Sequence, residues 1–355
     1  MARRALDESD VRVRPGRRGS RPRTKTRPEH ADAEPALVTG VDRGRYTVLV
    51  DVDGPREHVA IAMKARELGR ERVVPGDRVD LVGDTSGTDG SLSRIVRIAD
   101  RSTVLRRTAD DTDPVERVIV ANADQLVVVT ALADPEPRTR MIDRCVVAAY
   151  DAGMDVLLAL TKADLADPAP LRALYEPIGV QVVVTSRGDG TAGPAGPDGI
   201  GGLGALLDAL AGRTSVLVGH SGVGKSTLVN ALVPDARRAT GVVNDVTGRG
   251  RHTSTSAVAL RVPVAGGGTW VIDTPGVRSF GLAHVDPTHL LGAFGDLAEV
   301  AEDCPRGCDH AAGTPECALD EWVEAAPDGT ERAARTARVD SFRRLLASRT
   351  GVADA

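Results

Sequence analysis

The stretch GHSGVGKST, from Gly219 to Thr227, places glycines, a lysine and hydroxyl groups at the spacing of a phosphate-binding loop. It fits the pattern G-x-x-x-x-G-K-[ST] and lies between a strand-like run, SVLV, and a helix-like segment, STLVNAL, as that pattern requires. In such a loop the backbone amides close around a β-phosphate, the lysine reaches the β- and γ-phosphate oxygens, and the serine hydroxyl binds Mg²⁺. The residues expected to bind a nucleotide here are Gly219, Ser221, Gly222, Val223, Gly224, Lys225, Ser226 and Thr227.

The stretch WVIDTPG, about fifty residues later, supplies a second signal of the same chemistry. It ends a strand-like run with Asp273 and then places Gly276 in the pattern D-x-x-G. The carboxylate is expected to hold Mg²⁺ together with Ser226, while the Gly276 amide contacts the γ-phosphate. Because Lys225 faces the phosphate that would be transferred, we count it as a catalytic residue as well as a binding residue.

A candidate for base recognition, [NT]-K-x-D, follows the run VLLAL and consists of Thr161, Lys162, Ala163 and Asp164. A carboxylate at the last position accepts hydrogen bonds from the N1 and N2 donors of guanine, which adenine does not present in that arrangement. The motif therefore predicts GTP and GDP as ligands. A match of four residues is weak evidence by itself, but VTS, which ends at Ser186 and closes the next strand-like run, supplies the usual companion loop.

The order of these signals along the chain is unusual. A conventional GTPase has the phosphate-binding loop first and the base motif near its end, whereas here the base motif and its companion loop come first. The order predicts a circularly permuted GTPase domain. Much of the chain before Gly219 is then the second half of that domain.

Three cysteines and a histidine lie close together near the C-terminus, in CPRGCDHAAGTPEC. Three thiols and an imidazole satisfy the tetrahedral coordination of Zn²⁺, and a closed set of four ligands indicates a structural site. The alternative is a group of surface cysteines without a metal. The fourth cysteine, Cys145, is expected to be a buried helical residue. The zinc ligands predicted by this spacing are Cys304, Cys308, His310 and Cys317.

The elements that must position these residues follow from hydrophobic periodicity. Near-continuous apolar runs from about Asp124 onward alternate with helical stretches, which predicts an α/β domain with a parallel sheet. After about Gly281 the chain is expected to be helical, ending in an amphipathic helix with Val339, Phe342 and Leu346 on one face and solvated arginines elsewhere. The expected divisions are a basic arm (1–35), a barrel (36–105), a GTPase domain (106–285) and a zinc-binding helical domain (286–355).

Five short strand-like runs between Ala36 and about Ala99, separated by turns such as Pro75-Gly76-Asp77, predict a small closed β-barrel of the OB type. Many such barrels bind nucleic acid, but a docking scaffold is the alternative because aromatic residues for stacking are scarce. Tyr46 is the single stacking candidate in this part of the sequence.

The first 28 residues hold ten Arg or Lys and three acidic residues, so this segment is near +7 and the remainder of the chain near −12. Its lack of hydrophobic period predicts a disordered arm, which either contacts RNA phosphates or only improves solubility. The sequence shows no secretory signal and no run of eighteen apolar residues. We therefore expect a cytoplasmic protein that does not act on a membrane.

These features together resemble the ribosome small-subunit-dependent GTPase A (RsgA) family. The resemblance rests on the permuted order, the N-terminal barrel, the Cys/His cluster and the motifs ANADQ, GHSGVGKSTLVN, GRGRHTSTS and DTPGVRSFGL, and it spans roughly Ala36 to Arg349. It implies a GTPase that binds the 30S subunit and its 16S rRNA late in subunit maturation, is stimulated by the subunit, and carries one Zn²⁺. We expect a monomer. One departure is Thr161, where the family usually has Asn. The resemblance therefore does not predict how tightly this chain binds the nucleotide.

The stretch VTGRGRHTSTS occupies the position of switch I. One hydroxyl among Thr253, Ser254 and Thr255 is expected to reach Mg²⁺ when the γ-phosphate is present. Val277 stands where many GTPases have the glutamine that orients water, and the resemblance points to His252 as the substitute. Imidazole chemistry permits that role, and the alternatives for His252 are a solvated loop residue or a contact to ribosomal RNA.

Two other functional classes remain open at this stage. A metabolic enzyme with a phosphate-binding loop would need an acceptor pocket, and the base motif argues against it. An RNA-binding assembly scaffold that uses the nucleotide only as a binding switch is the stronger rival, although the intact Lys225, Ser226 and Asp273 argue for hydrolysis. A GTPase assay with and without 30S subunits separates these classes.

Overall fold

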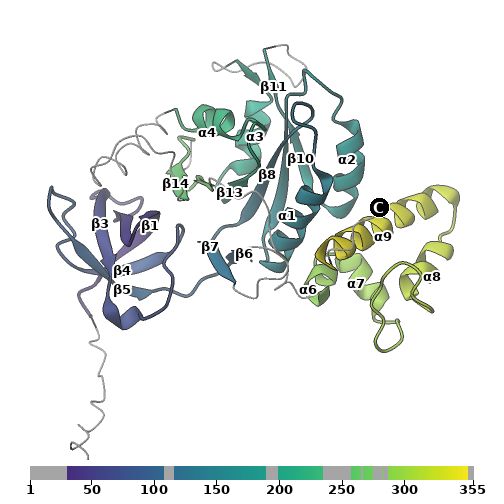
Figure 1. Cartoon of the computed structure of the whole chain (residues 1–355), viewed down its shortest axis with the longest axis horizontal. Coiled ribbons are helices and arrows are strands. Elements are labelled where there is room, and N and C mark those ends of the chain that lie inside the picture. The colour runs from purple at the N-terminus through teal and green to yellow at the C-terminus, as the bar shows by residue number, and fades with distance from the viewer. Residues whose placement is uncertain are drawn as a thin grey trace, which may run out of the picture. The chain divides into compact units, whose positions relative to one another are not determined.

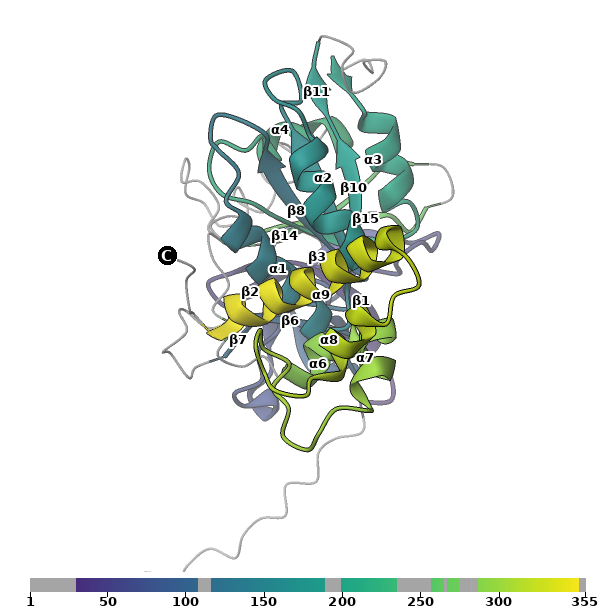
Figure 2. The ribbon, with the colours of Figure 1, turned by 90° about the vertical axis from the view of Figure 1, so that its right-hand side faces the viewer.

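The structure is a computed structural model that describes residues 30–107, 116–188, 199–234, 257–264, 267–274, 282 and 287–350. The chain divides into two units, Met1–Ala31 and Asp32–Ala355. Residues 1–29 of the predicted basic arm lie outside the described residues. The fold below is therefore that of the second unit, and Figures 1 and 2 show it in two views.

The N-terminal part of this unit is a closed barrel of five strands. The strand order β1-β2-β3-β5-β4 is closed by pairing of β4 with β1, which confirms the predicted OB-like barrel. The barrel has its own core, and Tyr46 is 8% exposed within it, so Tyr46 offers no surface for stacking bases. The strands are β1 (Glu34–Asp42), β2 (Arg45–Val50), β3 (His58–Lys64), β4 (Arg78–Gly83) and β5 (Ser93–Ile98), with a 3-10 turn, η2 (Arg66–Leu68), after β3.

The central part is a sheet whose strands β10, β9, β8, β13 and β15 are all parallel, with β14 antiparallel to β15 and paired in turn with β1 of the barrel. This confirms the predicted parallel α/β sheet. The strands are β8 (Gln125–Ala131), β9 (Asp155–Thr161), β10 (Gln181–Val184), β13 (Thr214–Val218), β14 (Val258–Arg261) and β15 (Trp270–Asp273). Two short pairs lie outside it: β6 (Val104–Arg107) with β7 (Arg117–Ala121), and β11 (Ser186–Arg187) with β12 (Ile200–Gly201).

Both faces of this sheet are buried because alternate side chains of each strand enter different cores. Leu126 and Val128 of β8 pack with α1 (Thr139–Asp151) and α2 (Ala169–Tyr175). Val127 and Val129 pack with α3 (Leu203–Leu210) and α4 (Lys225–Leu232) on the other face. Burial on both faces explains why these strands read as continuous apolar runs. Cys145 of α1 is fully buried, as predicted.

The C-terminal part is helical, and its long last helix lies against α1, as Figure 2 shows. Val339 and Phe342 are buried as predicted, and Leu345 is buried more deeply than the predicted Leu346. The helices are α6 (Pro287–Gly292), α7 (Gly295–Ala301), α8 (Ala318–Glu324) and α9 (Gly329–Thr350), and a 3-10 turn, η3 (Glu176–Ile178), follows α2.

The expectation of solvated arginines on α9 is wrong for four of them. Arg335, Arg338, Arg343 and Arg344 have side chains only 13–26% exposed, and each forms an ion pair with a carboxylate. Three of these guanidinium groups also lie over the rings of Trp322, Phe294 and Tyr175.

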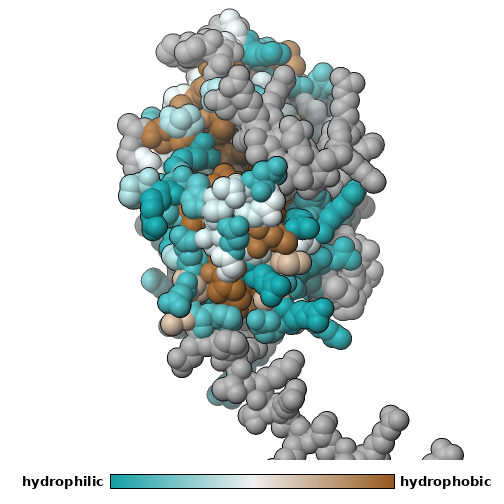
Figure 3. Space-filling model, turned by 90° about the vertical axis from the view of Figure 1, so that its left-hand side faces the viewer, coloured by the Kyte–Doolittle hydropathy of each residue, from teal (hydrophilic) through white to brown (hydrophobic). Residues whose placement is uncertain are grey.

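The surface shown in Figure 3 is mainly hydrophilic among its coloured residues, and its hydrophobic side chains form small separate groups. Within the described ranges the exposed large hydrophobic residues are Val59, Leu165 and Leu174. No helix among these residues is long and apolar enough to cross a membrane.

Candidate functional site

The loop from Gly219 to Gly224 joins the end of β13 to the start of α4, at the carboxyl edge of the parallel sheet. Its glycines are required by its geometry. A Cβ on Gly219 would lie 2.6 Å from the carbonyl oxygen of Val129, and Gly222 and Gly224 have φ of +86° and +89°. Only glycine adopts this conformation without strain, so the backbone can form the close turn that leads into the helix. Ser221, Ser226 and Thr227 are exposed at this turn, and Val223 is buried.

Thr161 at the end of β9 connects the base motif to this loop. Its side chain is buried, and its hydroxyl donates a hydrogen bond to the carbonyl oxygen of Val223 at 2.6 Å. Its side chain also lies 3.6–3.7 Å from the position that a Cβ on Gly224 would occupy. The threonine therefore ties the base motif directly to the phosphate-binding loop, although it is smaller than the asparagine expected there.

Asp164 and Ser186 lie just after the neighbouring strands β9 and β10, and Ser186 is the first residue of β11. The side chain of Asp164 is exposed, and one of its oxygens accepts a hydrogen bond from the backbone N–H of Arg187 at 3.3 Å. Ala163 donates its backbone N–H to the carbonyl oxygen of Thr185, which joins the base motif to its companion loop. Lys162 donates to the carbonyl oxygen of Asp134 in the loop after β8. The two motifs predicted from sequence thus lie together at one edge of the sheet.

Asp273 ends β15 beside the phosphate-binding loop, and the Lys225 ammonium forms an ion pair with its carboxylate. The lysine and aspartate expected to bind phosphate and Mg²⁺ are therefore adjacent. The exposed Ser226 hydroxyl and the Asp273 carboxylate are oxygen donors, which is the ligand chemistry that Mg²⁺ prefers. The residues fit this ion, with most of its remaining ligands coming from phosphate and water.

The structure does not place the switch residues of the predicted site. They lie outside the described residues and remain predictions: His252, Thr253, Ser254, Thr255, Gly276 and Val277.

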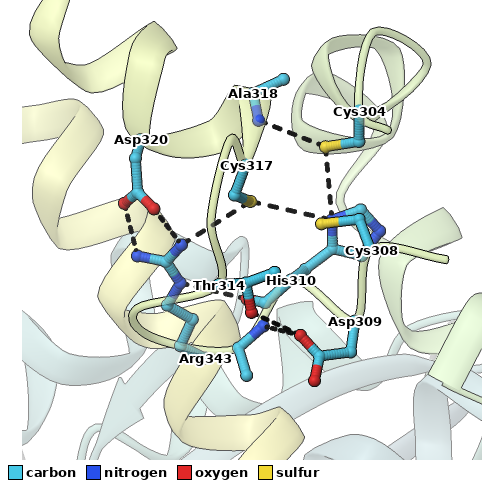
Figure 4. Close-up of polar contacts among 10 residues, drawn as sticks. Cys304, Cys308, Asp309, His310, Thr314, Cys317, Ala318, Asp320 and Arg343 are labelled. Atoms are coloured by element: carbon cyan, nitrogen blue, oxygen red, sulfur yellow. Dashed lines mark hydrogen bonds and ion pairs between the residues drawn. The ribbon is translucent and has the colours of Figure 1, made fainter. Parts of the chain in front are cut away.

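The second candidate site is the Cys/His cluster between α7 and α8, shown in Figure 4. Its four ligand atoms lie within 4.8 Å of one another. The Nδ1 atom of His310 is 3.6 Å from the sulfur of Cys304, 3.4 Å from that of Cys308 and 4.0 Å from that of Cys317. These separations suit bonds of about 2.0–2.3 Å from four tetrahedral ligands to one Zn²⁺.

The local chemistry of the cluster also fits a cation. Burial lowers the pKa of His310, so the imidazole is neutral near pH 7, which is the form that binds metals. Burial, together with the neighbouring thiols, raises the pKa of Cys308 to about 11. A metal ion among the sulfurs would offset that cost by stabilising thiolates, so the residues fit a structural zinc ion.

Two groups that sequence analysis missed complete this cluster. The backbone N–H of Ala318 donates to the sulfur of Cys304 at 3.3 Å. Arg343 of α9 lies 3.8 Å from the sulfur of Cys317 and forms two hydrogen bonds with Asp320, at 2.7 and 2.8 Å (Figure 4). Arg343 is more than twenty residues away from Cys317 in sequence, so only the packing of α9 reveals the contact.

Comparisons with known proteins agree with this geometry. The family model for the RsgA GTPase matches residues 98–283. A small ribosomal subunit biogenesis GTPase RsgA from Pseudomonas fluorescens is 34% identical over 319 residues, which cover 87% of this chain and 85% of that protein. The chain belongs to the RsgA GTPase family. A second RsgA relative, from Chlorobaculum parvum, is 32% identical over 306 residues, covering 83% and 94% of the two chains.

Two solved structures show that the whole fold is shared. YjeQ from Thermotoga maritima has a TM-score of 0.60 at 23% identity and covers 90% of this chain and 100% of its own. YloQ, described as a circularly permuted GTPase, has a TM-score of 0.59 at 22% identity and covers 92% and 98%. The fold shared with these two structures therefore extends beyond the residues that the family model matches.

Proposed function

We propose that this chain is a GTPase that acts late in maturation of the small ribosomal subunit, with hydrolysis of GTP to GDP and phosphate stimulated by the 30S subunit. The observation that carries the proposal is the hydrogen bond from Thr161 to Val223, because it joins the base motif to the phosphate-binding loop at one edge of the sheet. Ligands of α/β sheets bind at this edge. The relatives are named small ribosomal subunit biogenesis GTPase, and from these names we infer the process in which this chain acts.

The roles of the individual residues follow from this placement. Asp164 accepts hydrogen bonds from guanine, and the backbone of the phosphate-binding loop holds the phosphates. Lys225 exchanges its partner Asp273 for phosphate oxygens, so both charges stay compensated before and after nucleotide binding. When bound between Ser226 and Asp273, Mg²⁺ neutralises charge on the β- and γ-phosphates.

His252 is proposed to orient the attacking water. The proposal rests on Val277, which has no polar group, at the position where glutamine is usual. A neutral imidazole within hydrogen-bond distance of water can hold it in line with the γ-phosphate. One hydroxyl of Thr253, Ser254 and Thr255 would be a further ligand of Mg²⁺.

The proposal extends to partners and location. The 16S rRNA of the 30S subunit is the expected RNA, contacted by the barrel, the zinc-binding helical domain and the basic arm of residues 1–35. The Zn²⁺ at Cys304, Cys308, His310 and Cys317 is structural. The protein is proposed to be a cytoplasmic monomer that does not bind membranes.

Single-turnover phosphate release, measured with and without purified 30S subunits, tests the proposal. We expect slow release by the free protein, faster release on the subunit, and no release by Lys225→Ala. His252→Ala should bind GTP and the subunit normally but lose roughly 10²-fold in the stimulated rate, as expected for a lost general acid or base.

A protein that binds GTP and 30S subunits but releases no phosphate would be a scaffold with a nucleotide switch, and the enzymatic part of the proposal would fall. Wild-type stimulated release by His252→Ala would assign water positioning to another group.

A further inference from the structure

The short strand β14 belongs to the GTPase sheet but also pairs with the barrel. On one side Val258 lies opposite Asp273 of β15, and Arg261 lies opposite Trp270. On the other side Val258 lies opposite Gly40 of β1. One row of paired residues therefore runs from the barrel through β14 to the carboxylate proposed to bind Mg²⁺. Since neighbouring strands are about 4.8 Å apart, the barrel backbone lies roughly 10 Å from Asp273.

The other end of β14 is held by an ion pair with the barrel. The Arg261 guanidinium donates to both carboxylate oxygens of Glu57, at 2.9 and 2.6 Å, and lies 3.1 Å from an oxygen of Asp53. It also lies over the Trp270 ring, 4.9 Å from the centroid. The side chains of Arg261 and Glu57 are 34% and 25% exposed. A two-bonded, partly buried pair of this kind is stronger and more directional than a typical surface ion pair.

The barrel loop between β2 and β3 is held by hydrogen bonds to two carboxylates, one of which is Glu57. Glu57 accepts a hydrogen bond from the backbone N–H of Asp53 at 2.7 Å, and Arg56 donates its N–H to Asp51 at 2.9 Å. Burial by itself would raise the pKa of Glu57, but the hydrogen bonds and charge of Arg261 and the Asp53 N–H hold it below its ordinary value. Glu57 is therefore ionised at neutral pH, and any ligand that moves this loop also moves the partner of Arg261.

We infer that the Glu57–Arg261 pair couples the barrel to the Mg²⁺-nucleotide site, with Arg261 as a positioning residue that acts through β14 and β15 on Asp273. The inference rests on the proposed function. The contact between barrel and sheet would then transmit changes between two binding sites as well as hold the two parts together. Such coupling is reciprocal. A ligand on the barrel that disturbs the pair changes the affinity for Mg²⁺ and GTP, and Mg²⁺-GTP changes the affinity for that ligand by the same factor.

Equilibrium binding of fluorescent GTP and GDP, without ribosomal subunits, tests this inference. The variants are Glu57→Gln and Arg261→Met, each measured in Mg²⁺ and in EDTA. We expect affinity in Mg²⁺ to fall roughly three- to tenfold, the range for a partly buried ion pair, and affinity in EDTA to stay unchanged. Asp80→Asn is the matched control, because Asp80 pairs with Arg97 at 2.8 Å between β4 and β5, wholly within the barrel. It should change neither affinity.

Three further comparisons separate coupling from simple destabilisation. The double variant Glu57→Gln with Arg261→Met should be no weaker than either single variant, because both remove the same contact. Arg261→Lys keeps the charge but loses the two-bonded geometry, so it should have an intermediate effect. Affinities that fall equally in Mg²⁺ and EDTA, or an effect of Asp80→Asn as large as that of Glu57→Gln, would overturn the inference.

The outcome for the proposed function is read separately. If the wild-type protein neither binds nor hydrolyses GTP, the proposed function fails. If it does both while Glu57→Gln and Arg261→Met keep wild-type affinity in Mg²⁺, only the coupling fails.

Discussion

The barrel and the helical domain are joined to the GTPase sheet in different ways. The helical domain shares one hydrophobic core with it: Phe294, Phe342 and Leu345 belong to the same cluster as Ile142 and Val146 of α1. The barrel keeps a core of its own and joins this cluster only at its edge, where Leu49 of β2 is a member and Leu37 and Val52 pack against it. Polar and backbone contacts make up the rest of that junction. An extensive shared core makes two parts fold as one unit, whereas a smaller and more polar junction allows two stable parts to change their contact.

The two junctions also differ in how they use charge. On the helical side, the Arg344 guanidinium donates to the buried carboxylate of Asp143 at 2.9 Å, which also accepts from the Tyr175 hydroxyl at 2.8 Å. On the barrel side, Asp77 is fully buried and pairs with Arg101, and Asn122 donates to the carbonyl oxygen of Gly76 at 2.9 Å. Both sides therefore contain satisfied buried polar groups. A ring packs on one arginine of the barrel junction, Arg261, and on three arginines of the helical side.

Removal of the proposed zinc ion should have the largest effect, because the cluster of Cys304, Cys308, His310 and Cys317 lies in the segment between α7 and α8. Elemental analysis should find close to one Zn²⁺ per chain, and Cys308→Ser should lose it. Because the core is shared, the loss should lower the melting temperature of the helical and GTPase domains together. Cys145→Ala, outside the cluster, should retain the metal. A metal-free wild-type protein with an unchanged melting curve would contradict the assignment.

Truncation of one core residue on each side compares the junctions directly. Phe342→Ala, at a residue 1% exposed, should cost about 3–5 kcal/mol and weaken nucleotide binding, since its core is shared. Leu81→Ala, at a fully buried barrel residue, should cost about 2–5 kcal/mol but leave nucleotide binding near normal. Urea unfolding combined with fluorescent GTP titration measures both. Equal losses of GTP affinity would remove the distinction between the two junctions.

Gly76→Ala should disturb the barrel junction specifically. A Cβ at Gly76, where φ is +89°, would lie 2.0 Å from the carbonyl oxygen of Ala121. Gly90 is the matched control, because its φ is +81° and nothing lies within 4 Å of its Cβ position. Gly90→Ala should cost about 1–2 kcal/mol from backbone strain. Gly76→Ala should cost roughly 1–3 kcal/mol more through the clash, measured by urea unfolding. Similar losses of unfolding free energy in both variants would show that the backbone at the junction moves enough to relieve the clash.

The smallest effect concerns pH and the barrel alone. Both ring nitrogens of His58 lie 2.7 Å from backbone carbonyl oxygens, of Arg56 and Thr85, and only the imidazolium form donates to both. These hydrogen bonds raise the pKa of His58 above its ordinary 6.5. Its contribution to stability is therefore complete below pH 6.5 and is lost as the pH rises through the raised value. An NMR titration of the ring should show that pKa, and His58→Gln should remove the pH dependence. A ring pKa at or below 6.5 would refute the two hydrogen bonds from the His58 ring to the carbonyl oxygens of Arg56 and Thr85.

The nucleotide motifs and the predicted zinc ligands can be recognised in the sequence because each motif is local. A phosphate-binding loop needs its residues within a few positions of one another, and so does a cluster such as Cys304 to Cys317. Thr161, Ser186 and Asp273 each end or follow a strand of the predicted parallel sheet. Because the carboxyl ends of parallel strands meet at one edge, the sequence also predicts that these residues lie together. The five barrel strands were also predicted, with β1 beginning at Glu34, two residues before the expected domain boundary at residue 36.

Local sequence patterns do not predict the contacts between elements that are distant in the sequence. Arg261 and Glu57 are 204 positions apart, and no periodic pattern links them. Helical period predicts a solvated face for the arginines of α9, because it identifies the apolar face of a helix. It does not identify the carboxylates and rings that other elements bring to the polar face. Ser186 and Arg187 pair with Ile200 and Gly201, and no sequence motif links the two pairs of residues. In each case the partner is distant in sequence and is set by the tertiary fold.

The pairing of β1 with β14 also bears on solubility. An open sheet ends in a strand whose backbone N–H and C=O groups are free to pair with another chain, and such edges promote aggregation unless something covers them. Here the barrel supplies the neighbouring strand at Val258. A GTPase domain expressed without residues 32–98 would expose the β14 edge to other copies of itself, so the barrel also acts as the edge protection of the sheet that binds the nucleotide.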